Sequence, residues 1–372
     1  MRPIRLAMVG GGPGAFIGPV HRMAAELDGR MRLVAGAFSR DARKSEEAAR
    51  TWGVRGYADW REMIAAEAGR EDGAEVLAVV TPNHLHFEPA RTALQAGLHV
   101  VSDKPATRDL AQAQALAQTV AASGRLYGLT YTYTGYPMVR EAREIVRRGE
   151  LGAVRKVIVE YSQGWLSEPV ERTGAKQAEW RTDPAQAGAG CIGDIGVHAF
   201  NIAEFVTGMR VQKLCADVST VVPGRGLDDD CNVLMRFEGG ARGVLVASQI
   251  SAGARNGLRL QVFGERGGLT WWHERAGELT LDWLDAPSQT MHAASSYLTP
   301  LALGASRIPA GHPEGFIEAF ANLYRDFADA VTKGSAEAGL VPSIAEGVRS
   351  MAFVEAAVAA SGKGWVDLQV AA

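Results

Sequence analysis

The sequence predicts an α/β protein with two domains: an N-terminal Rossmann domain on a doubly wound parallel sheet, and a C-terminal α+β domain with a mostly antiparallel sheet. Its 372 residues suffice for two domains, because a domain usually holds roughly 100 to 200 residues. Strand and helix patterns alternate up to about residue 129, and extended segments with Gly-rich turns follow from about residue 150. We therefore place the domains at residues 1–129 and 130–372.

Short apolar runs alternate with amphipathic stretches in the first domain. The segments are, in order, Ile4–Val9, Ile17–Leu27, Leu33–Phe38, Lys44–Trp52, Val76–Val80, Pro89–Ala96, His99–Ser102, Leu110–Ala122 and Leu126–Leu129. Strands that alternate with helical patterns are typical of βαβ units, whose parallel sheet is covered on both faces. The first domain is therefore predicted to be doubly wound.

The period of the pattern changes in the second domain. The extended candidates are Val154–Gln163, Val211–Val222, Asn232–Phe237, Arg242–Gln249, Leu258–Phe263 and Leu269–Trp272. Gly-rich turns such as residues 238–240 separate neighbours, as in hairpins. Two helical patterns, Pro313–Val331 and Ser343–Ala360, close the chain. The polar stretch 286–312 is predicted to be a loop, which either borders a site or only connects.

Charge and cysteine content exclude several classes of protein. The net charge is −3, with 39 basic and 42 acidic residues spread along the chain, so we expect no nucleic-acid partner and no membrane surface. No apolar stretch approaches the roughly 20 residues that span a bilayer, and a strand pattern that begins at residue 4 leaves no room for a signal peptide. Cys191, Cys215 and Cys231 lack CxxC or Cys/His spacing, which argues against disulfides and a metal site and favours a cytoplasmic setting.

A Gly-rich turn follows the first predicted strand. Residues 10–18 read GGGPGAFIG, and a helical pattern then begins. Such glycines permit a tight turn, let the backbone approach a pyrophosphate and place it at a helix N-terminus. The third small residue of the motif is either Ala15 or Gly18. We predict a dinucleotide site lined by Gly10, Gly12, Pro13, Gly14, Ala15, Phe16 and Ile17.

The end of the second predicted strand bears on the choice of cofactor. An acidic side chain there binds the ribose hydroxyls of NAD, whereas an Arg accommodates the 2′-phosphate of NADP. The strand ends Phe38-Ser39-Arg40-Asp41. Ser39 and Arg40 favour NADP over NAD, and Asp41 is the opposing carboxylate. If Arg40 is only a solvated loop charge, NAD binds comparably.

The next strand also ends in polar residues, at the edge where open α/β sheets bind ligands. Residues 79–86 read VVTPNHLH. We expect His86 to be a packing or helix-surface residue. The residues expected to line the cofactor are Thr81, Pro82, Asn83 and His84.

Lys104 follows the strand His99–Ser102 at the same edge. Near a bound nicotinamide, a lysine can donate a hydrogen bond to a substrate hydroxyl and stabilise alkoxide character as hydride leaves. On spacing alone, a surface lysine is the alternative.

A carboxylate and an imidazole share one face of a predicted helix in the second domain. Asp194 and His198 are four residues apart in a segment with helical apolar spacing. Such a pair can act as a general base, with a pKa near the operating pH. A local structural ion pair is the alternative.

Taken together, these segments resemble the Gfo/Idh/MocA family, named for glucose-fructose oxidoreductase, inositol dehydrogenase and a rhizopine-catabolism protein. The motifs are the Gly-rich turn at 10–18, TPNHLH at 81–86, DKP at 103–105 and GDIGVH at 193–198. The resemblance implies an NAD(P)-dependent dehydrogenase that acts on a secondary hydroxyl or ketone of a sugar, inositol or related polyol. It also implies an open C-terminal sheet, through which the protein forms a homodimer or homotetramer.

The resemblance assigns roles as well. The family's catalytic lysine falls on Lys104, and its aspartate and histidine fall on Asp194 and His198. By that analogy His198 accepts the hydroxyl proton, Asp194 positions the substrate, and Lys104 polarises the reacting oxygen. The usual Glu-Lys-Pro is Asp103-Lys104-Pro105 here, so Asp103 is expected to hold the lysine or the nicotinamide ribose differently.

Aromatic and polar side chains suit a sugar ring, which has apolar faces and hydroxyl edges. Tyr133, Trp165 and Arg181 are the predicted substrate residues, with ordinary packing or a structural salt bridge as the alternative for each. Two other functions stay open. One is glycoside cleavage through transient oxidation by bound NAD, and the other is a cofactor-sensing regulator without catalysis. Retention of all three catalytic residues argues against the regulator.

Overall fold

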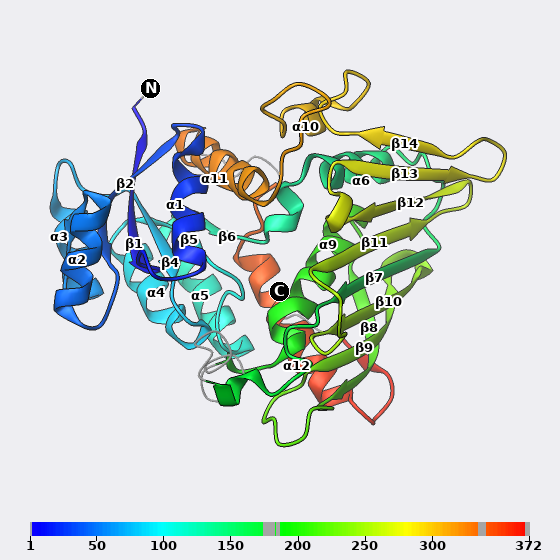
Figure 1. The fold of residues 1–372 in the computed structure, drawn as a ribbon, viewed down its shortest axis with the longest axis horizontal. Coiled ribbons are helices and arrows are strands. Elements are labelled where there is room, and N and C mark those ends of the chain that lie inside the picture. The colour runs from blue at the N-terminus through cyan, green and yellow to red at the C-terminus, as the bar shows by residue number, and fades with distance from the viewer. Residues whose placement is uncertain (1, 174–182, 184–186, 334–339, 369–372) are drawn as a thin grey trace. The chain divides into compact units, whose positions relative to one another are not determined.

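The computed structural model describes residues 2–173, 183, 187–333 and 340–368, and the chain forms two compact units (Figure 1). The first unit runs to Gly135 and also includes Phe316–Val348; the second holds Tyr136–Gly315 and the residues from Arg349 onward. This division differs from the one expected at residues 129 and 130. A sequence pattern does not reveal that a late segment returns to the first unit.

A six-stranded sheet forms the centre of the first unit. Its strand order is β3-β2-β1-β4-β5-β6, and every pairing is parallel. All five residues of β4 are buried, as expected where helices cover both faces of a parallel sheet. The prediction of a doubly wound domain is confirmed. The strands are β1 (Ile4–Gly10), β2 (Met31–Ala37), β3 (Arg55–Gly56), β4 (Val76–Val80), β5 (His99–Ser102) and β6 (Tyr127–Leu129).

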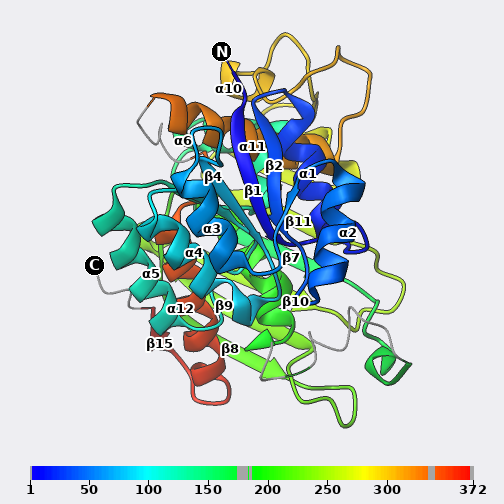
Figure 2. The same cartoon turned by 90° about the vertical axis from the view of Figure 1, so that its left-hand side faces the viewer.

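Three helices of the first unit begin at aspartate side-chain caps. The carboxylates of Asp41, Asp59 and Asp109 accept backbone N–H groups at the starts of α2, α3 and α5. Figure 2 shows β1, β2 and β4 side by side, with helices of the same unit around them. The sequence pattern missed α3, of which only three residues are buried, and the two-residue β3. The helices are α1 (Ile17–Leu27), α2 (Ala42–Trp52), α3 (Trp60–Gly69), α4 (Phe87–Gln95), α5 (Leu110–Ser123) and α11 (Phe316–Lys333).

Helix α11 completes the core of the first unit although it comes late in the chain. It packs against α1, and its residues Phe320, Tyr324 and Phe327 belong to the same buried cluster as Leu6 and Met8 of β1. The pattern predicted this helix at nearly the same residues. Its packing into the first unit depends on tertiary contacts, which the periodicity of the sequence does not predict.

The second unit contains a nine-stranded open sheet in the order β14-β13-β12-β11-β7-β10-β9-β8-β15. Its pairings are antiparallel, except that β7 and β10 are parallel. The prediction of a mostly antiparallel sheet is confirmed. The strands are β7 (Lys156–Ser162), β8 (Val211–Ser219), β9 (Asp230–Phe237), β10 (Arg242–Ser248), β11 (Gly257–Phe263), β12 (Gly267–Trp272), β13 (Glu278–Trp283), β14 (Gln289–His292) and β15 (Val366–Asp367).

Helices α6 (Pro137–Arg147) and α9 (Val197–Thr207) pack on one face of this sheet (Figure 1). In β7, Val157, Val159 and Tyr161 are buried while their neighbours are more exposed, which is the period-two pattern of a strand with one covered face. Helix α12 (Ile344–Ala360) spans both units. Within the second unit its Phe353 stacks on Phe200 of α9 at 4.3 Å between ring centroids.

The stretch 286–312, predicted to be a loop, contains some regular secondary structure. It contains β14, which pairs with β13, and the short helix α10 (Pro300–Leu303). The four residues of β14 are mostly exposed, so they lack the apolar alternation that would have indicated a strand. Among the described residues, no helix is long and apolar enough to cross a membrane.

Candidate functional site

The Gly-rich turn leaves β1 through two residues whose backbone conformation only glycine adopts readily. Gly10 and Gly11 have φ of +75° and +65°, in the left-handed region. A Cβ at Gly10 would also lie 2.6 Å from the carbonyl oxygen of Val80 on β4. The turn is therefore pressed against the neighbouring strand.

Gly18 makes the closest helix contact in this motif. A Cβ on Gly18 would lie 1.6 Å from the carbonyl oxygen of Gly11, so the first turn of α1 approaches the backbone of the turn directly. Ala15 lies at the outer part of the turn, where its N–H donates to the Gly12 carbonyl at 2.8 Å. A Cβ at Gly14 would meet no atom within 4 Å. Of the two residues expected to close the motif, Gly18 makes the close helix contact.

The turn fits a dinucleotide pyrophosphate. Its outer residues, from Pro13 to Phe16, are exposed, and α1 begins at Ile17, whose first-turn N–H groups have no intrahelical partner. No side chain fills the space beside Gly14. Seven of the residues predicted to line the cofactor lie in this turn or at the first helical residue: Gly10, Gly12, Pro13, Gly14, Ala15, Phe16 and Ile17.

The segment after β2 carries the three residues that bear on binding of the cofactor's ribose, and each has a different environment. The Asp41 carboxylate accepts the Lys44 N–H at 3.2 Å and caps α2. The Ser39 hydroxyl accepts the Asp41 N–H at 3.1 Å, and Arg40 is exposed. The one carboxylate of the segment is therefore already engaged by its own helix.

Polar atoms without partners lie at the carboxyl end of β4. Thr81 Oγ1 and His84 Nδ1 are both buried and make no hydrogen bond within the described part of the chain. Pro82 and the buried Asn83 lie between them. Because buried polar atoms in native proteins usually have partners, this edge suits the polar groups of a bound ligand.

His86 connects the ends of β4 and β5. It is 1% exposed, and its Nε2 and Nδ1 lie 2.7 Å from the carbonyl oxygens of Thr81 and Pro105, respectively. The imidazole therefore ties the segment that carries Thr81 to the one that carries Lys104. This agrees with the packing role expected for it.

Asp103 fixes the backbone beside Lys104. One carboxylate oxygen accepts the Lys104 N–H at 2.8 Å and the Thr130 hydroxyl at 3.1 Å. The other lies 3.9 Å from His21 Nε2. Burial alone would raise the pKa of the Asp103 carboxyl, but the neighbouring His21 side chain, followed by Lys104 and His86, lowers that pKa well below its usual value.

His21 and Tyr324 complete this buried group, and the sequence pattern missed both. His21 Nδ1 lies 2.7 Å from the Tyr324 hydroxyl, and both residues are almost fully buried. Burial, and then the Asp103 charge, raise the pKa of Tyr324 far above its usual value, so it stays protonated. Helix α11 thus reaches the segment that carries Lys104 through two side chains.

In the second unit, the half-buried Asp228 carboxylate shapes the segment that carries Asp194. Asp228 accepts the N–H groups of Gly190 and Ile192 at 2.7 and 2.8 Å. A Cβ on Gly190 would lie 1.9 Å from the Asp228 carbonyl oxygen. Burial raises the pKa of Asp228, although the two backbone N–H groups oppose that shift. The glycine in the sequence is therefore required by close packing.

Asp194 lies in a π-helical turn, Ile192–Gly196, that leads directly into α9 with His198 in its first turn. The sequence pattern predicted a regular helix here, and the π turn replaces its start. Such turns are rare and often occur at functional sites. The Asp194 carboxylate accepts a hydrogen bond from Gln249 Nε2 at 2.9 Å, and the His198 ring lies 6.2 Å from the Tyr161 ring.

The predicted substrate residues fall in different places. Tyr133 belongs to the first unit and is 4% exposed, in the 3-10 turn Thr132–Gly135. Trp165 belongs to the second unit and is 37% exposed, and its Nε1 donates to Gln163 Oε1 at 3.0 Å. Arg181 lies outside the described residues.

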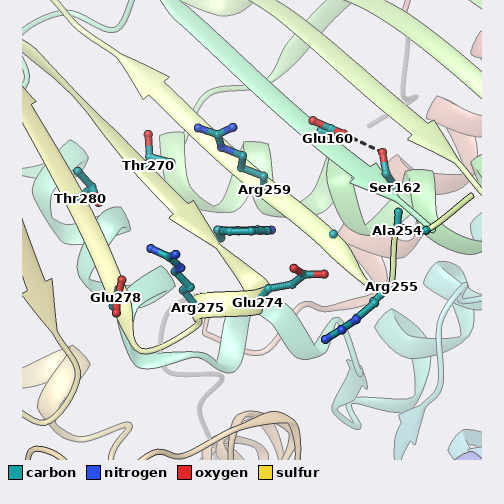
Figure 3. A pocket seen from close by; sticks show the side chains of 13 residues that line it. Glu160, Ser162, Ala254, Arg255, Arg259, Thr270, Glu274, Arg275, Glu278 and Thr280 are labelled. Atoms are coloured by element: carbon teal, nitrogen blue, oxygen red, sulfur yellow. Dashed lines mark hydrogen bonds between the residues drawn. The ribbon is translucent and has the colours of Figure 1, made fainter. Parts of the chain in front are cut away.

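The second sheet has a hollow of about 480 Å³ on the face opposite α9 (Figure 3). Arginines and glutamates alternate around it, including Glu160, Arg259 and Glu278, and Trp272 lies among them. None of the predicted site residues lines this hollow. Its strands present their second, less buried face here.

We expect Gly18→Ala to destabilise the first unit. The added methyl would meet the Gly11 carbonyl at 1.6 Å, and overpacking of this kind costs roughly 1–3 kcal/mol or more. Gly14→Ala is the matched control, since its methyl would meet nothing within 4 Å. Denaturant unfolding should show a loss for Gly18→Ala alone. Equal midpoints for the two variants would contradict the close contact.

Asp103→Asn tests the buried carboxylate through pH. Because the folded pKa of Asp103 is lowered, its ionised form stabilises the fold above the unfolded pKa of roughly 3.9, and that contribution falls as the pH drops below it. We expect the difference in unfolding free energy between wild type and variant to be equal at pH 7 and pH 5. At pH 3 it should shrink by about 1 kcal/mol. A difference that does not change with pH would refute the lowered pKa.

Comparison with known proteins matches both units. A model of the oxidoreductase family with an NAD-binding Rossmann fold matches residues 4–131, and a Gfo/Idh/MocA C-terminal domain matches residues 139–270. An oxidoreductase of Bacillus subtilis is 33% identical over 99% of this chain and 98% of its own. Levoglucosan dehydrogenase of Pseudarthrobacter phenanthrenivorans is 26% identical over 99% of each chain.

Solved structures agree. An inositol dehydrogenase homolog from Azotobacter vinelandii, complexed with NAD+, superposes with a TM-score of 0.94 at 39% identity and covers 98% of this chain and 97% of that one. A structure of an inositol dehydrogenase homolog from the same organism holds NADH and myo-inositol, with a TM-score of 0.90 at 38% identity over 98% of each chain. The resemblance drawn from the four motifs is confirmed: the chain belongs to the Gfo/Idh/MocA oxidoreductase family, with an NAD-binding Rossmann fold in its first unit.

Proposed function

We propose that this protein transfers hydride between a nicotinamide dinucleotide and a secondary hydroxyl or ketone of a sugar, inositol or related polyol. One observation carries the proposal: Lys104 follows β5 at the same carboxyl edge of the parallel sheet as the Gly-rich turn after β1. An inositol dehydrogenase homolog that binds myo-inositol and a levoglucosan dehydrogenase, both similar to this chain, support the substrate class. A lysine at that edge suits an oxygen that gains negative charge.

The cofactor site fits the residues present. The turn from Gly10 to Ile17 would bind the pyrophosphate. Thr81 Oγ1 and His84 Nδ1, which make no hydrogen bond to the residues the structure describes, would contact the rest of the dinucleotide. When bound, the nicotinamide supplies hydride transfer. The protein's own side chains bind and orient the substrate and transfer the hydroxyl proton.

We assign three catalytic roles. The Lys104 ammonium donates a hydrogen bond to the reacting oxygen, and the His198 imidazole accepts the hydroxyl proton when the substrate is oxidised. Asp194 accepts a hydrogen bond from a neighbouring substrate hydroxyl, which orients the ring. In the reverse direction His198 returns the proton to the alkoxide oxygen.

Trp165 is the better candidate of the two described aromatic residues for a sugar-ring contact. Its indole is about one-third exposed at 37%, whereas Tyr133 has 4% of its surface exposed. An exposed aromatic face can stack on the C–H face of a sugar ring. Tyr133 then contributes through packing in its own unit, and Arg181 stays a substrate residue on the sequence argument alone.

We propose that NADP is preferred to NAD. The support is local: Asp41 caps α2, so its carboxylate is engaged, while Arg40 is exposed beside the Ser39 hydroxyl. An Arg at this position accommodates a 2′-phosphate. Homologous structures hold NAD+ or NADH, so we expect NAD to be used as well, at lower efficiency.

We also propose that copies of the chain pair through the open sheet. Trp272, at 37% exposure, lies on that face with arginines and glutamates around it. Side chains of both signs on one face can pair across a two-fold axis. A homodimer or homotetramer would cover this hollow.

Lys104→Ala and His198→Ala test the catalytic assignment. Each should lower kcat roughly 10²- to 10⁴-fold, because each removes a group that acts in the transition state, while dinucleotide affinity stays within twofold. The assay follows reduced nicotinamide during turnover of inositols, sugars and their keto derivatives. Lys156→Ala and His312→Ala, away from the proposed site, serve as matched controls. Full turnover in either test variant would refute its role.

Arg40→Ala tests the cofactor preference. We expect kcat/KM for NADP to fall roughly tenfold or more, since a hydrogen bond between charged groups contributes about 1.5–3 kcal/mol, and kcat/KM for NAD to stay within twofold. Arg43→Ala, three residues further along, is the matched control. Equal kcat/KM for both cofactors in the unsubstituted protein would overturn the preference.

A further inference from the structure

We infer that Gln163 and Gln249, here called the amide pair, are positioning residues that set the orientation of the Asp194 carboxylate and the Trp165 indole for one substrate. The inference rests on the proposed function, in which Asp194 and Trp165 contact the sugar or polyol ring. Neither glutamine was singled out by the sequence pattern.

Hydrogen bonds join the amide pair to both site residues. Gln249 Nε2 donates to Asp194 Oδ2 at 2.9 Å and to Gln163 Oε1 at 3.4 Å. Gln163 Oε1 also accepts the Trp165 indole N–H at 3.0 Å. A short path of three hydrogen bonds therefore runs from the carboxylate to the indole.

The direction of each bond is fixed by groups that can play only one part. An indole N–H can only donate, and an ionised carboxylate can only accept. Gln163 must therefore present its oxygen to Trp165, and Gln249 must present its NH₂ group to Asp194. A reversed amide at either glutamine would place two donors or two acceptors together.

A second set of contacts fixes the far side of Gln163. Its Nε2 donates to Asn256 Oδ1 at 2.8 Å, and the Tyr161 hydroxyl donates to the same oxygen at 2.6 Å. The Tyr161 ring lies 6.2 Å from the His198 ring. The contacts of the amide pair thus extend to the side chain next to the proposed base.

Hydrogen bonds also fix the backbone of Gln249. Gln249 is 2% exposed; its N–H donates to the Asp229 carbonyl at 2.9 Å, and its carbonyl accepts the Leu166 N–H at 3.0 Å. The Arg225 guanidinium donates to the Leu166 carbonyl at 3.0 Å and to the Asp229 carboxylate at 2.9 Å. The loop that carries Trp165 is therefore anchored to the residue that orients Asp194.

This arrangement couples two substrate contacts. If the substrate stacks on Trp165 and bonds Asp194, a loss of either glutamine disturbs both contacts at once. A neutral amide suits this task, because it holds a carboxylate with one donor and adds no charge to a site for an uncharged polyol. Substitution should therefore affect turnover more than dinucleotide binding.

The test uses Gln249→Met and Gln163→Met in the full chain. Both changes keep the length of the side chain and remove its donor and acceptor. We expect kcat with the best polyol substrate to fall roughly 10- to 100-fold and dinucleotide affinity to stay within twofold. Gln261→Met is the matched control, since that β11 glutamine instead donates to Thr270 Oγ1 at 3.4 Å. Turnover within twofold of wild type in both test variants would overturn the inference.

A second readout separates this inference from the proposed function. The indole N–H resonance of Trp165, assigned by its loss in Trp165→Phe, should shift in Gln249→Met, because Gln249 acts on the indole through Gln163. Absence of turnover by the unsubstituted protein on every polyol would refute the proposed function alone. An unmoved resonance would refute the amide pair, whatever the activity.

Discussion

The parallel alignment of β1, β4 and β5 is the constraint on which the candidate site of the first unit depends. Because the three strands run the same way in adjacent positions, their carboxyl ends meet at one edge. The Gly-rich turn, Thr81 and Lys104 each follow one of these strands. Asp103, itself bonded by the Thr130 hydroxyl, holds the Lys104 backbone N–H, and His86 ties the Lys104 segment to that of Thr81. The sheet brings these groups together, and short hydrogen bonds determine their placement.

In the second unit, hydrogen bonds to the π turn and to its side chain place Asp194. The half-buried Asp228 carboxylate holds the start of the π turn, and Gln249 orients the Asp194 side chain within it. Keeping Asp228 in this position has a cost, since burial raises its pKa. The two backbone N–H groups offset that cost. Precision at Asp194 is thus supported by a second carboxylate that takes no direct part in the proposed reaction.

Most of the architecture could be predicted from the sequence, because period-two and βαβ patterns are local. The Gly-rich turn, the strand ends at Thr81 and Lys104 and the spacing of Asp194 and His198 are also local, and the structure places them in one turn, at one sheet edge and at the start of one helix. What could not be predicted depends on contacts between distant residues. His21 contacts Tyr324 across a sequence separation of 303 residues, and α11 returns to the first unit. The π turn at Ile192–Gly196 differs from an α-helix in its backbone hydrogen bonds, and the apolar spacing of so short a segment does not distinguish the two.

The single parallel pair in the second sheet has a further consequence. Ser162 of β7 lies opposite Ser248 of β10 in the register, so the two residues that follow them, Gln163 and Gln249, leave neighbouring strands in the same direction. In an antiparallel pair they would emerge at opposite ends. One reversal of strand direction therefore turns two residues 86 positions apart into neighbours.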